Sequence, residues 1–325
     1  MSTSLILGAA EIGAAVQPAS GRADYPLVNY GTASFNPSNK TITYALGRQR
    51  MSTALAVCHG SFGRVTVYRL DKPMRTHAHR EGHLTFLLSG QPAIVTISNV
   101  AHLVDQATGV AINPWQPHSF QPCSDDKPSV FLVAYICDPW LDRDHEGCGS
   151  LRFGANELRV GTTLCSICAS LAHALVSNAG FRIVNRYLNQ LFDASFDESW
   201  RTSDRPNLKS QPQTPIDFRV RKSLRILDDT LTEGIELDTV ARDAGLSRPH
   251  FFKLFRENTG LTPALYANTM RVERALDRLT RSQTSVTDIG YELGFSSQSH
   301  FTHFFSAHVG IAPTQYRAIA RVVSD

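Results

Sequence analysis

A residue pattern that occurs twice in the last third of this chain constrains its fold more than any other feature. The first copy spans residues 240–255 and the second spans residues 289–305. Identical residues recur at matching places in and just beyond the copies: Gly245 with Gly294, Ser247 with Ser296, His250 with His300, Phe251 with Phe301, Phe255 with Phe305, Gly260 with Gly310, Pro263 with Pro313, and Tyr266 with Tyr316. The second copy carries one extra residue in its middle. So close a match predicts that one small structural unit is built twice.

Each copy has the residues that two short helices joined by a tight turn require. The first helix is expected to end at Gly245 or Gly294, because glycine adopts a positive φ without a Cβ penalty. A serine two residues later, Ser247 or Ser296, stands where the next helix needs an N-cap. That next helix has one face of phenylalanines to bury and a polar face to leave free. The pattern therefore predicts a helix-turn-helix in each copy.

The segment between the copies is expected to form one long helix from Pro263 to Leu279. A capping-box pattern from Ser285 to Asp288 then starts the second copy. Such a helix would hold the two units at a fixed separation. If both units face the same way, they would enter successive major grooves of a DNA duplex, about 34 Å apart.

Residues on the free face of each second helix are the candidates for contacting DNA. Helical spacing selects Arg248, Pro249, Phe252, Lys253 and Arg256 in the first unit, and Ser297, Gln298, Ser299, Thr302 and His303 in the second. Ser247, Ser296 and the helix N-termini are better suited to phosphates. Lys253 could donate to guanine, and Gln298 could pair with adenine.

The two units differ in charge. No Lys or Arg occurs from Gln298 to His308, so the first unit is expected to supply more of the affinity. His250 and His300 sit beside core phenylalanines, which favours packing or a phosphate contact over base reading.

The first half of the chain has a different character. Short segments at 64–70, 84–88, 93–97 and 130–136 are rich in β-branched and aromatic residues and are separated by turns. They predict an antiparallel sandwich or small barrel. From about residue 156 to 192 the apolar period becomes helical, with a break at Gly180, which predicts two helices packed on the barrel or on a partner subunit.

Four histidines and three aromatic residues of this half are candidates for a ligand site. His77 and His79 share one face of a strand, which is a chelating geometry for Zn²⁺, Fe²⁺ or another first-row metal. The alternative is that the four histidines line the mouth of a pocket for a small organic effector, together with Phe86, Trp115 and Phe120.

Composition limits the remaining possibilities. The 325 residues suffice for two or three domains, and the net charge of +3 is close to neutral. We find no apolar run long enough for a membrane span and no signal peptide, so we expect a cytoplasmic protein with reduced thiols. Cys165 and Cys168 form a C-x-x-C in a helical pattern, which favours helix packing over a redox or metal role.

Residues 217–321 resemble the DNA-binding domain of the AraC/XylS family of transcription regulators. The stretches 294–301 and 310–317 carry the resemblance. It implies base contacts from seven of the candidates: Pro249, Phe252, Lys253, Gln298, Ser299, Thr302 and His303. It also implies an activator that binds double-stranded DNA, contacts RNA polymerase, and forms a homodimer through the helices that follow the barrel.

The first half resembles the two cupin motifs, and sensor domains of the same family are often cupin-like. His77, His79, Gly90 and His118 match the motifs, whereas His83 replaces a glutamate and Gln116 replaces a glycine. The resemblance implies that His83 and His118 complete a possible metal-ligand set with His77 and His79. The resemblance implies that a small-molecule effector binds in this domain. The alternatives are a metal-dependent cupin enzyme, such as a dioxygenase or isomerase, fused to a DNA-binding domain, and a regulator controlled by a partner protein. The missing glutamate disfavours the enzyme.

The predicted fold class is therefore α+β, with a cupin-like antiparallel barrel plus helices followed by an all-α domain with two helix-turn-helix motifs. The expected parts are an N-terminal arm (1–24), a sensing barrel (25–150), dimerisation helices (151–200), a linker (201–216) and the DNA-binding domain (217–325).

Overall fold

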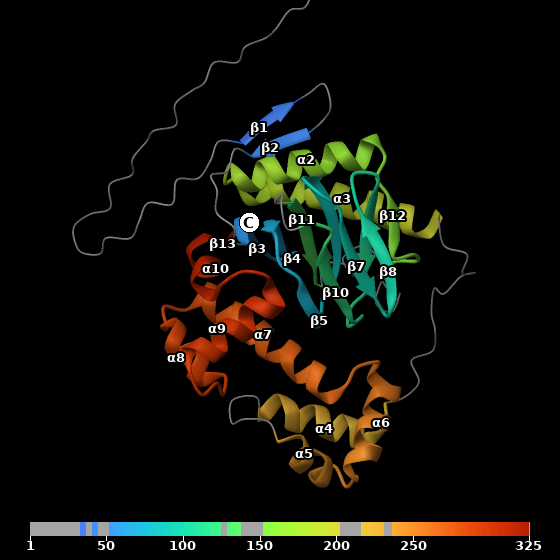
Figure 1. Ribbon diagram of the computed structural model, residues 1–325, viewed down its shortest axis with the longest axis vertical. Coiled ribbons are helices and arrows are strands. Elements are labelled where there is room, and N and C mark those ends of the chain that lie inside the picture. Colours follow the sequence, from blue (N-terminus) through green and yellow to red (C-terminus); the bar gives the residue numbers. More distant parts are fainter. Residues whose placement is uncertain are drawn as a thin grey trace, which may run out of the picture.

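The computed structural model describes residues 33–36, 41–44, 52–124, 129–137, 152–201, 216–230 and 236–324. The predicted N-terminal arm, and the linker apart from its two end residues, lie outside these residues. Figure 1 shows a sheet-rich N-terminal part and a helical C-terminal part. The predicted α+β class is confirmed.

Two sheets form the core of the N-terminal part. The seven-stranded sheet has the order β12-β9-β6-β11-β4-β3-β13, and the four-stranded sheet has the order β5-β10-β7-β8. Their strands are β3 (Thr53–Gly60), β4 (Gly63–Leu70), β5 (Met74–His77), β6 (Gly82–Ser89), β7 (Ala93–Ile97), β8 (Val100–Val104), β9 (Thr108–Ile112), β10 (His118–Pro122), β11 (Ser129–Ile136), β12 (Glu157–Arg159) and β13 (Ala320–Val322). A separate hairpin joins β1 (Ala33–Asn36) and β2 (Thr41–Tyr44).

The two sheets share an apolar interior, to which both contribute, but no hydrogen-bonded ring closes among the described strands. The predicted small barrel is thus an open, two-sheet form of the same architecture. The four strand segments chosen from the sequence fall on β4, β6, β7 and β11. The reason is that alternating β-branched and aromatic residues suit a pleated, half-buried surface.

Two helices cover the outer face of the seven-stranded sheet. They are α2 (Thr162–Val176) and α3 (Phe181–Arg201), and the break between them falls at the predicted Gly180. Their apolar faces pack with outward-facing residues of the sheet, including Val65, Leu84 and Phe86. Leu158, which we expected to mark a helix, lies instead in β12, paired with β9.

The C-terminal part contains the predicted pair of helix-turn-helix units. Its helices are α4 (Phe218–Asp229), α5 (Leu237–Asp243), α6 (Arg248–Thr259), α7 (Pro263–Arg281), α8 (Val286–Glu292), α9 (Gln298–Val309) and α10 (Pro313–Ile319). The first unit is α5–α6 and the second is α8–α9. Gly245 and Gly294 have φ values of +74° and +79°, as the turn chemistry required.

The N-cap of the second unit differs from the one expected. Ser297, and not Ser296, caps α9, and its Oγ accepts from the backbone nitrogen of His300 at 3.2 Å. The extra residue in this turn moves the helix start by one position. In the first unit the N-cap residue is Ser247, without a side-chain hydrogen bond.

The second unit is docked on the N-terminal part. β13 adds to the edge of the seven-stranded sheet as a parallel neighbour of β3, and α10 lies against β3 (Figure 1). Aromatic residues of α9 and α10, Phe301, Phe305 and Tyr316 among them, join the same apolar cluster as the sheet interior. Tyr316 is hydrogen-bonded to Nε2 of His59 at 2.7 Å. The last residues of the chain thus become part of the first domain's sheet.

None of the helices in the described ranges is both long and apolar enough to cross a membrane.

Candidate nucleic-acid interface and histidine site

The free face of α6 is exposed and cationic. Lys253 is 74% exposed and lies 4.0 Å from Glu257. Arg248 pairs with Asp238 of α5 and also lies over the Phe252 ring, 5.5 Å from its centroid. The opposite face buries Phe251 and Phe255 completely. Arg256 and Pro249 are also exposed, so α6 can approach the polyanionic surface of DNA without rearranging its core.

The corresponding face of α9 is exposed but polar. Gln298, Ser299 and His303 are exposed, and Thr302 is half-buried. The Gln298 amide oxygen accepts from Thr287 Oγ1 of α8 at 3.0 Å, which orients this side chain. Ser297 uses its hydroxyl for the helix cap, so it is less free for the DNA contact predicted for it.

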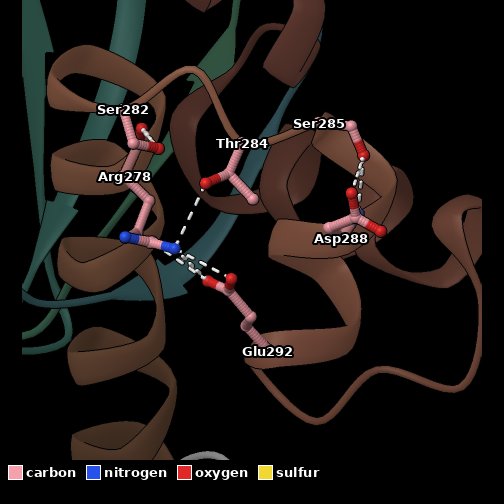
Figure 2. A network of polar contacts seen from close by, with 6 residues as sticks. All are labelled: Arg278, Ser282, Thr284, Ser285, Asp288 and Glu292. Carbon is pink, nitrogen blue, oxygen red and sulfur yellow. Dashed lines mark hydrogen bonds and ion pairs between the residues drawn. The ribbon is translucent and has the colours of Figure 1, made fainter.

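A polar network fixes the second unit to the end of α7 (Figure 2). Arg278 contacts the Glu292 carboxylate through two nitrogens, with the shortest distance 2.7 Å. The same guanidinium donates to Thr284 Oγ1 at 3.2 Å. Beside it, Ser285 Oγ accepts from the backbone nitrogen of Asp288 at 3.0 Å and donates to its carboxylate at 2.7 Å. The bidentate geometry sets the angle between α7 and α8.

The four predicted histidines come together inside the N-terminal part. His77 ends β5, His83 lies in β6 and His118 begins β10, and each of the four is at most 7% exposed. Ring centroids are 4.3 Å apart for His77 and His118, 4.6 Å for His83 and His118, and 5.3 Å for His79 and His83. The ligand nitrogens of His77, His79 and His118 all lie within 4.8 Å of one another. Two-residue spacing and the cupin resemblance together thus selected residues that form a spatial cluster.

Burial keeps these imidazoles neutral. Removal from water, and then the neighbouring histidines, lower the pKa of all four, to about 3 for His83 and His118. His77 and His118 each place Nδ1 near a backbone carbonyl, of Arg75 at 2.6 Å and of Gln116 at 2.8 Å. Nε2 of His79, Nδ1 of His83 and Nε2 of His118 have no hydrogen-bond partner. A neutral imidazole with an unused, inward nitrogen is a ready metal ligand.

A small cavity adjoins the cluster. It is lined by His77, His83, His118 and apolar or hydroxyl residues from both sheets, including Phe120, Tyr68 and Tyr135. Its free volume is about 30 Å³, which holds one or two waters.

Two of the three expected pocket aromatics lie elsewhere. Phe86 points to the outer face of its strand and packs with the helices α2 and α3, because side chains alternate along a strand and His83 and Thr85 take the inner face. Trp115 stacks on Tyr266 of α7, with centroids 5.4 Å apart and planes at 17°. Of the three, Phe120 alone lines the cavity.

Sequence reasoning missed the residues that surround the histidines. Arg64 is 4% exposed, and its guanidinium lies 3.7 Å from the centroid of the Tyr135 ring. Tyr68 is also buried, with its hydroxyl unpartnered. The signal was present in the alternation of β4 and β11, which puts these residues on the inner face, but an arginine in a strand is normally expected to face outward.

Comparison with known proteins identifies the C-terminal part. Residues 240–319 match the helix-turn-helix domain family. This is the region in which the sequence predicted two helix-turn-helix units, so the match supports the resemblance to AraC-type domains.

The matching relatives are transcription regulators. The transcriptional activator RhaS of Escherichia coli is 34% identical over 99 residues, which are 30% of this chain and 36% of RhaS. The regulatory protein PocR of Salmonella typhimurium is 32% identical over 111 residues, which are 34% of this chain and 37% of PocR. The chain thus spans little more than a third of the length of these relatives.

A solved structure extends the likeness to both parts of the fold. A single-residue variant of ToxT from Vibrio cholerae, solved in its apo form, superposes with a TM-score of 0.51, at 16% identity, over 80% of this chain and 97% of that one. At this identity the likeness shows a common fold, with a sheet-rich N-terminal part and a helical C-terminal part.

Proposed function

We propose that this protein is a transcription regulator that binds double-stranded DNA sequence-specifically through both helix-turn-helix units. The observation that carries the proposal is that α6 and α9 each bury a phenylalanine face and expose a polar one, at the two ends of a single helix. The helix α7 has 19 residues and so is about 28 Å long. That length suits two reading helices about one DNA turn, or 34 Å, apart.

The residues proposed to contact DNA are those selected from the sequence. Lys253, Arg248 and Arg256 would supply charge, and Gln298, Ser299 and His303 would supply base contacts from the second unit. Pro249, Phe252 and Thr302 would add apolar or hydroxyl contacts. Ser247 would contact a phosphate, whereas the hydroxyl of Ser297 is engaged in the cap.

We also propose a role for each of the three main parts of the chain. The parts 25–150, 151–200 and 217–325 serve sensing, dimerisation and DNA binding, and the protein activates transcription by contacting RNA polymerase in the cytoplasm. The inner faces of α2 and α3 are covered by the sheet, so a homodimer would use their outer faces, where Ile183 is 44% exposed. The N-terminal part would respond to a small-molecule effector, and the alternative is a metal-dependent cupin enzyme fused to a DNA-binding domain.

The test is selection of bound sequences from a random duplex library, followed by footprinting of the selected site. We expect two protected half-sites about 10 base pairs apart. The double variant Lys253→Ala/Gln298→Ala should lose this preference while keeping its fold. A full-length protein that binds the selected duplexes no better than random duplex at physiological salt would overturn the proposal.

A further inference from the structure

The buried histidines have no structural task that explains them. Three ring nitrogens from three different histidines lie buried without a hydrogen-bond partner. Leaving a buried polar nitrogen unpaired costs free energy, which an apolar side chain of the same size would avoid. Three such nitrogens in a cluster of four buried imidazoles point to a ligand that binds their lone pairs.

We propose that His77, His79, His83 and His118 bind one first-row divalent cation, with Zn²⁺ as the reference metal, and that its occupancy is transmitted to α7. The proposed metal site is argued from the four histidines alone. The proposed effect of metal occupancy on α7 rests on the DNA-binding function proposed above.

The donor set fits this class of metal. Imidazole nitrogen suits Zn²⁺, Fe²⁺, Co²⁺ and Ni²⁺, whereas Ca²⁺ and Mg²⁺ prefer oxygen. In His77 and His118, Nδ1–H would donate a hydrogen bond to the nearby backbone carbonyl, which leaves Nε2 for the metal and is the usual support of a metal-bound histidine. The ligand nitrogens of His77, His79 and His118 lie within 4.8 Å of one another. The ring centroid of His83 lies 4.6 Å from that of His118. Small ring rotations would bring them to the Zn–N distance of about 2.0–2.1 Å.

The segment that carries two of these histidines also holds α7. His77 and His79 face the cluster, and the residues between and after them face the opposite way. The carbonyl oxygen of Ala78 lies 3.2 Å from Thr269 Oγ1 of α7. The backbone nitrogen of Arg80 donates to Glu273 Oε1 at 3.2 Å, and its Nε lies 3.0 Å from Oε2.

A second contact reaches α7 from the same segment. The backbone nitrogen of Trp115 donates to the carbonyl oxygen of His79 at 2.7 Å, and the Trp115 ring stacks on Tyr266 near the start of α7. A cation that fixes His77 and His79 therefore fixes the backbone on which α7 rests. Because α7 separates the two DNA-reading units, its position sets their placement relative to the rest of the protein.

The metal arm of the test uses full-length protein prepared without an affinity tag and stripped with chelator. Titration with Zn²⁺ should show one equivalent bound, and Co²⁺ should give the visible absorption of a tetrahedral site. His79→Gln and the double variant His77→Ala/His79→Ala should lose at least tenfold in Zn²⁺ affinity. The control is His173→Ala, which changes an exposed histidine of α2.

Folding and metal loss are separated by circular dichroism of the metal-free proteins. If metal-free His79→Gln has the wild-type spectrum and melting temperature, its weaker Zn²⁺ binding reports the site itself. If neither variant folds, the Zn²⁺ affinity of the wild-type chain is measured by competition with a chromophoric chelator, and this result decides whether the site exists. Unchanged affinity in a folded variant, or no Zn²⁺ uptake by the wild-type chain, overturns the metal site.

The transmission arm compares DNA binding with and without Zn²⁺. We expect Zn²⁺ to change the apparent Kd for the selected duplex by about 5- to 150-fold, or to change the spacing of the footprint. Arg80→Ala and Thr269→Val should keep Zn²⁺ affinity and lose most of that change, whereas Val100→Ala, at an exposed position of β8, should keep both. Zn²⁺ binding without any effect on DNA binding overturns the transmission. Absence of specific DNA binding in every condition overturns instead the function on which it rests.

Discussion

At the scale of single residues, the turn glycines show how strictly the repeat is built. Gly245 has a φ of +74°, and an added Cβ would meet nothing within 4 Å. Its constraint is therefore conformational and not steric. A side chain in the left-handed region costs about 1–2 kcal/mol.

Gly245→Ala should accordingly lower the free energy of unfolding by about 1–2 kcal/mol. Urea denaturation followed by circular dichroism measures the change. Gly180→Ala is the matched control, since an added Cβ there also meets nothing within 4 Å and the φ of Gly180 lies outside the left-handed region. If the two substitutions cost the same, the turn does not require glycine.

The difference in charge between the two reading helices leads to a second prediction. Lys253 is exposed on α6, whereas the matching part of α9 presents His303 and no Lys or Arg. Lys253→Ala should weaken binding to the selected duplex more than His303→Ala at pH 7.5, and it should lower the steepness of the salt dependence. A gel-shift titration at several salt concentrations measures both. Equal losses in the two variants would show that the units share the affinity evenly.

At the scale of elements, the ion pair between α7 and α8 matters more for geometry than for stability. The Arg278 and Glu292 side chains are 40% and 45% exposed, and exposed pairs contribute about 0.2–1 kcal/mol. Glu292→Gln should therefore reduce the free energy of unfolding by less than about 1 kcal/mol, and the loss should shrink in high salt.

Urea denaturation at low and high salt measures this effect. Asp277→Asn is the comparison, because Asp277 pairs with Arg281 within one helix and so does not link two elements. The orientation role of Arg278 would be refuted if Glu292→Gln, with unchanged folding, left the footprint of the second half-site intact.

The elements also show what local sequence can and cannot predict. The glycines, phenylalanines and prolines of the repeat were enough to predict the second domain, since every contact that defines a helix-turn-helix lies within about 20 residues. Strand alternation located β4, β6, β7 and β11, and two-residue spacing with the cupin resemblance selected the histidines. Strand face was harder to choose for Phe86, because buried strands of this kind are apolar on both sides.

Contacts between distant segments were beyond local pattern. Nothing in Ala320–Val322 indicates that it will pair with β3, and nothing around Trp115 indicates that it stacks on α7 instead of closing a pocket. Both features depend on how the two domains meet, which periodicity does not encode. Ser297 replaced Ser296 as the cap for a simpler reason, the one-residue insertion in the turn.

At the scale of the whole molecule, the two domains form one continuous core through the second unit, while the first unit is held through α7. The contact between residues 78–80 and α7 is then the natural place for movement. Glu273 lies at its centre, facing Arg80 with Glu81 and Arg64 nearby. Burial, followed by repulsion from Glu81 and offset in part by Arg80, raises the pKa of Glu273 from 4.5 to about 7.

The raised pKa makes this contact sensitive to pH. In the docked form residues 78–80 contact α7, and in the separated form they do not. Between pH 4.5 and about 7 the Glu273 carboxyl is protonated in the docked form and ionised in the separated form. Docking should therefore weaken as pH rises through this window and then level off. The limit is about a tenfold change per pH unit. Trp115 emission reports docking, since its ring stacks on Tyr266, once the other two tryptophans of the chain are replaced by phenylalanine. Glu273→Gln should stay docked and lose the pH dependence. A wild-type curve that is flat from about pH 5 to 8, or one that the substitution leaves unchanged, would place the control of docking elsewhere than in this carboxyl group.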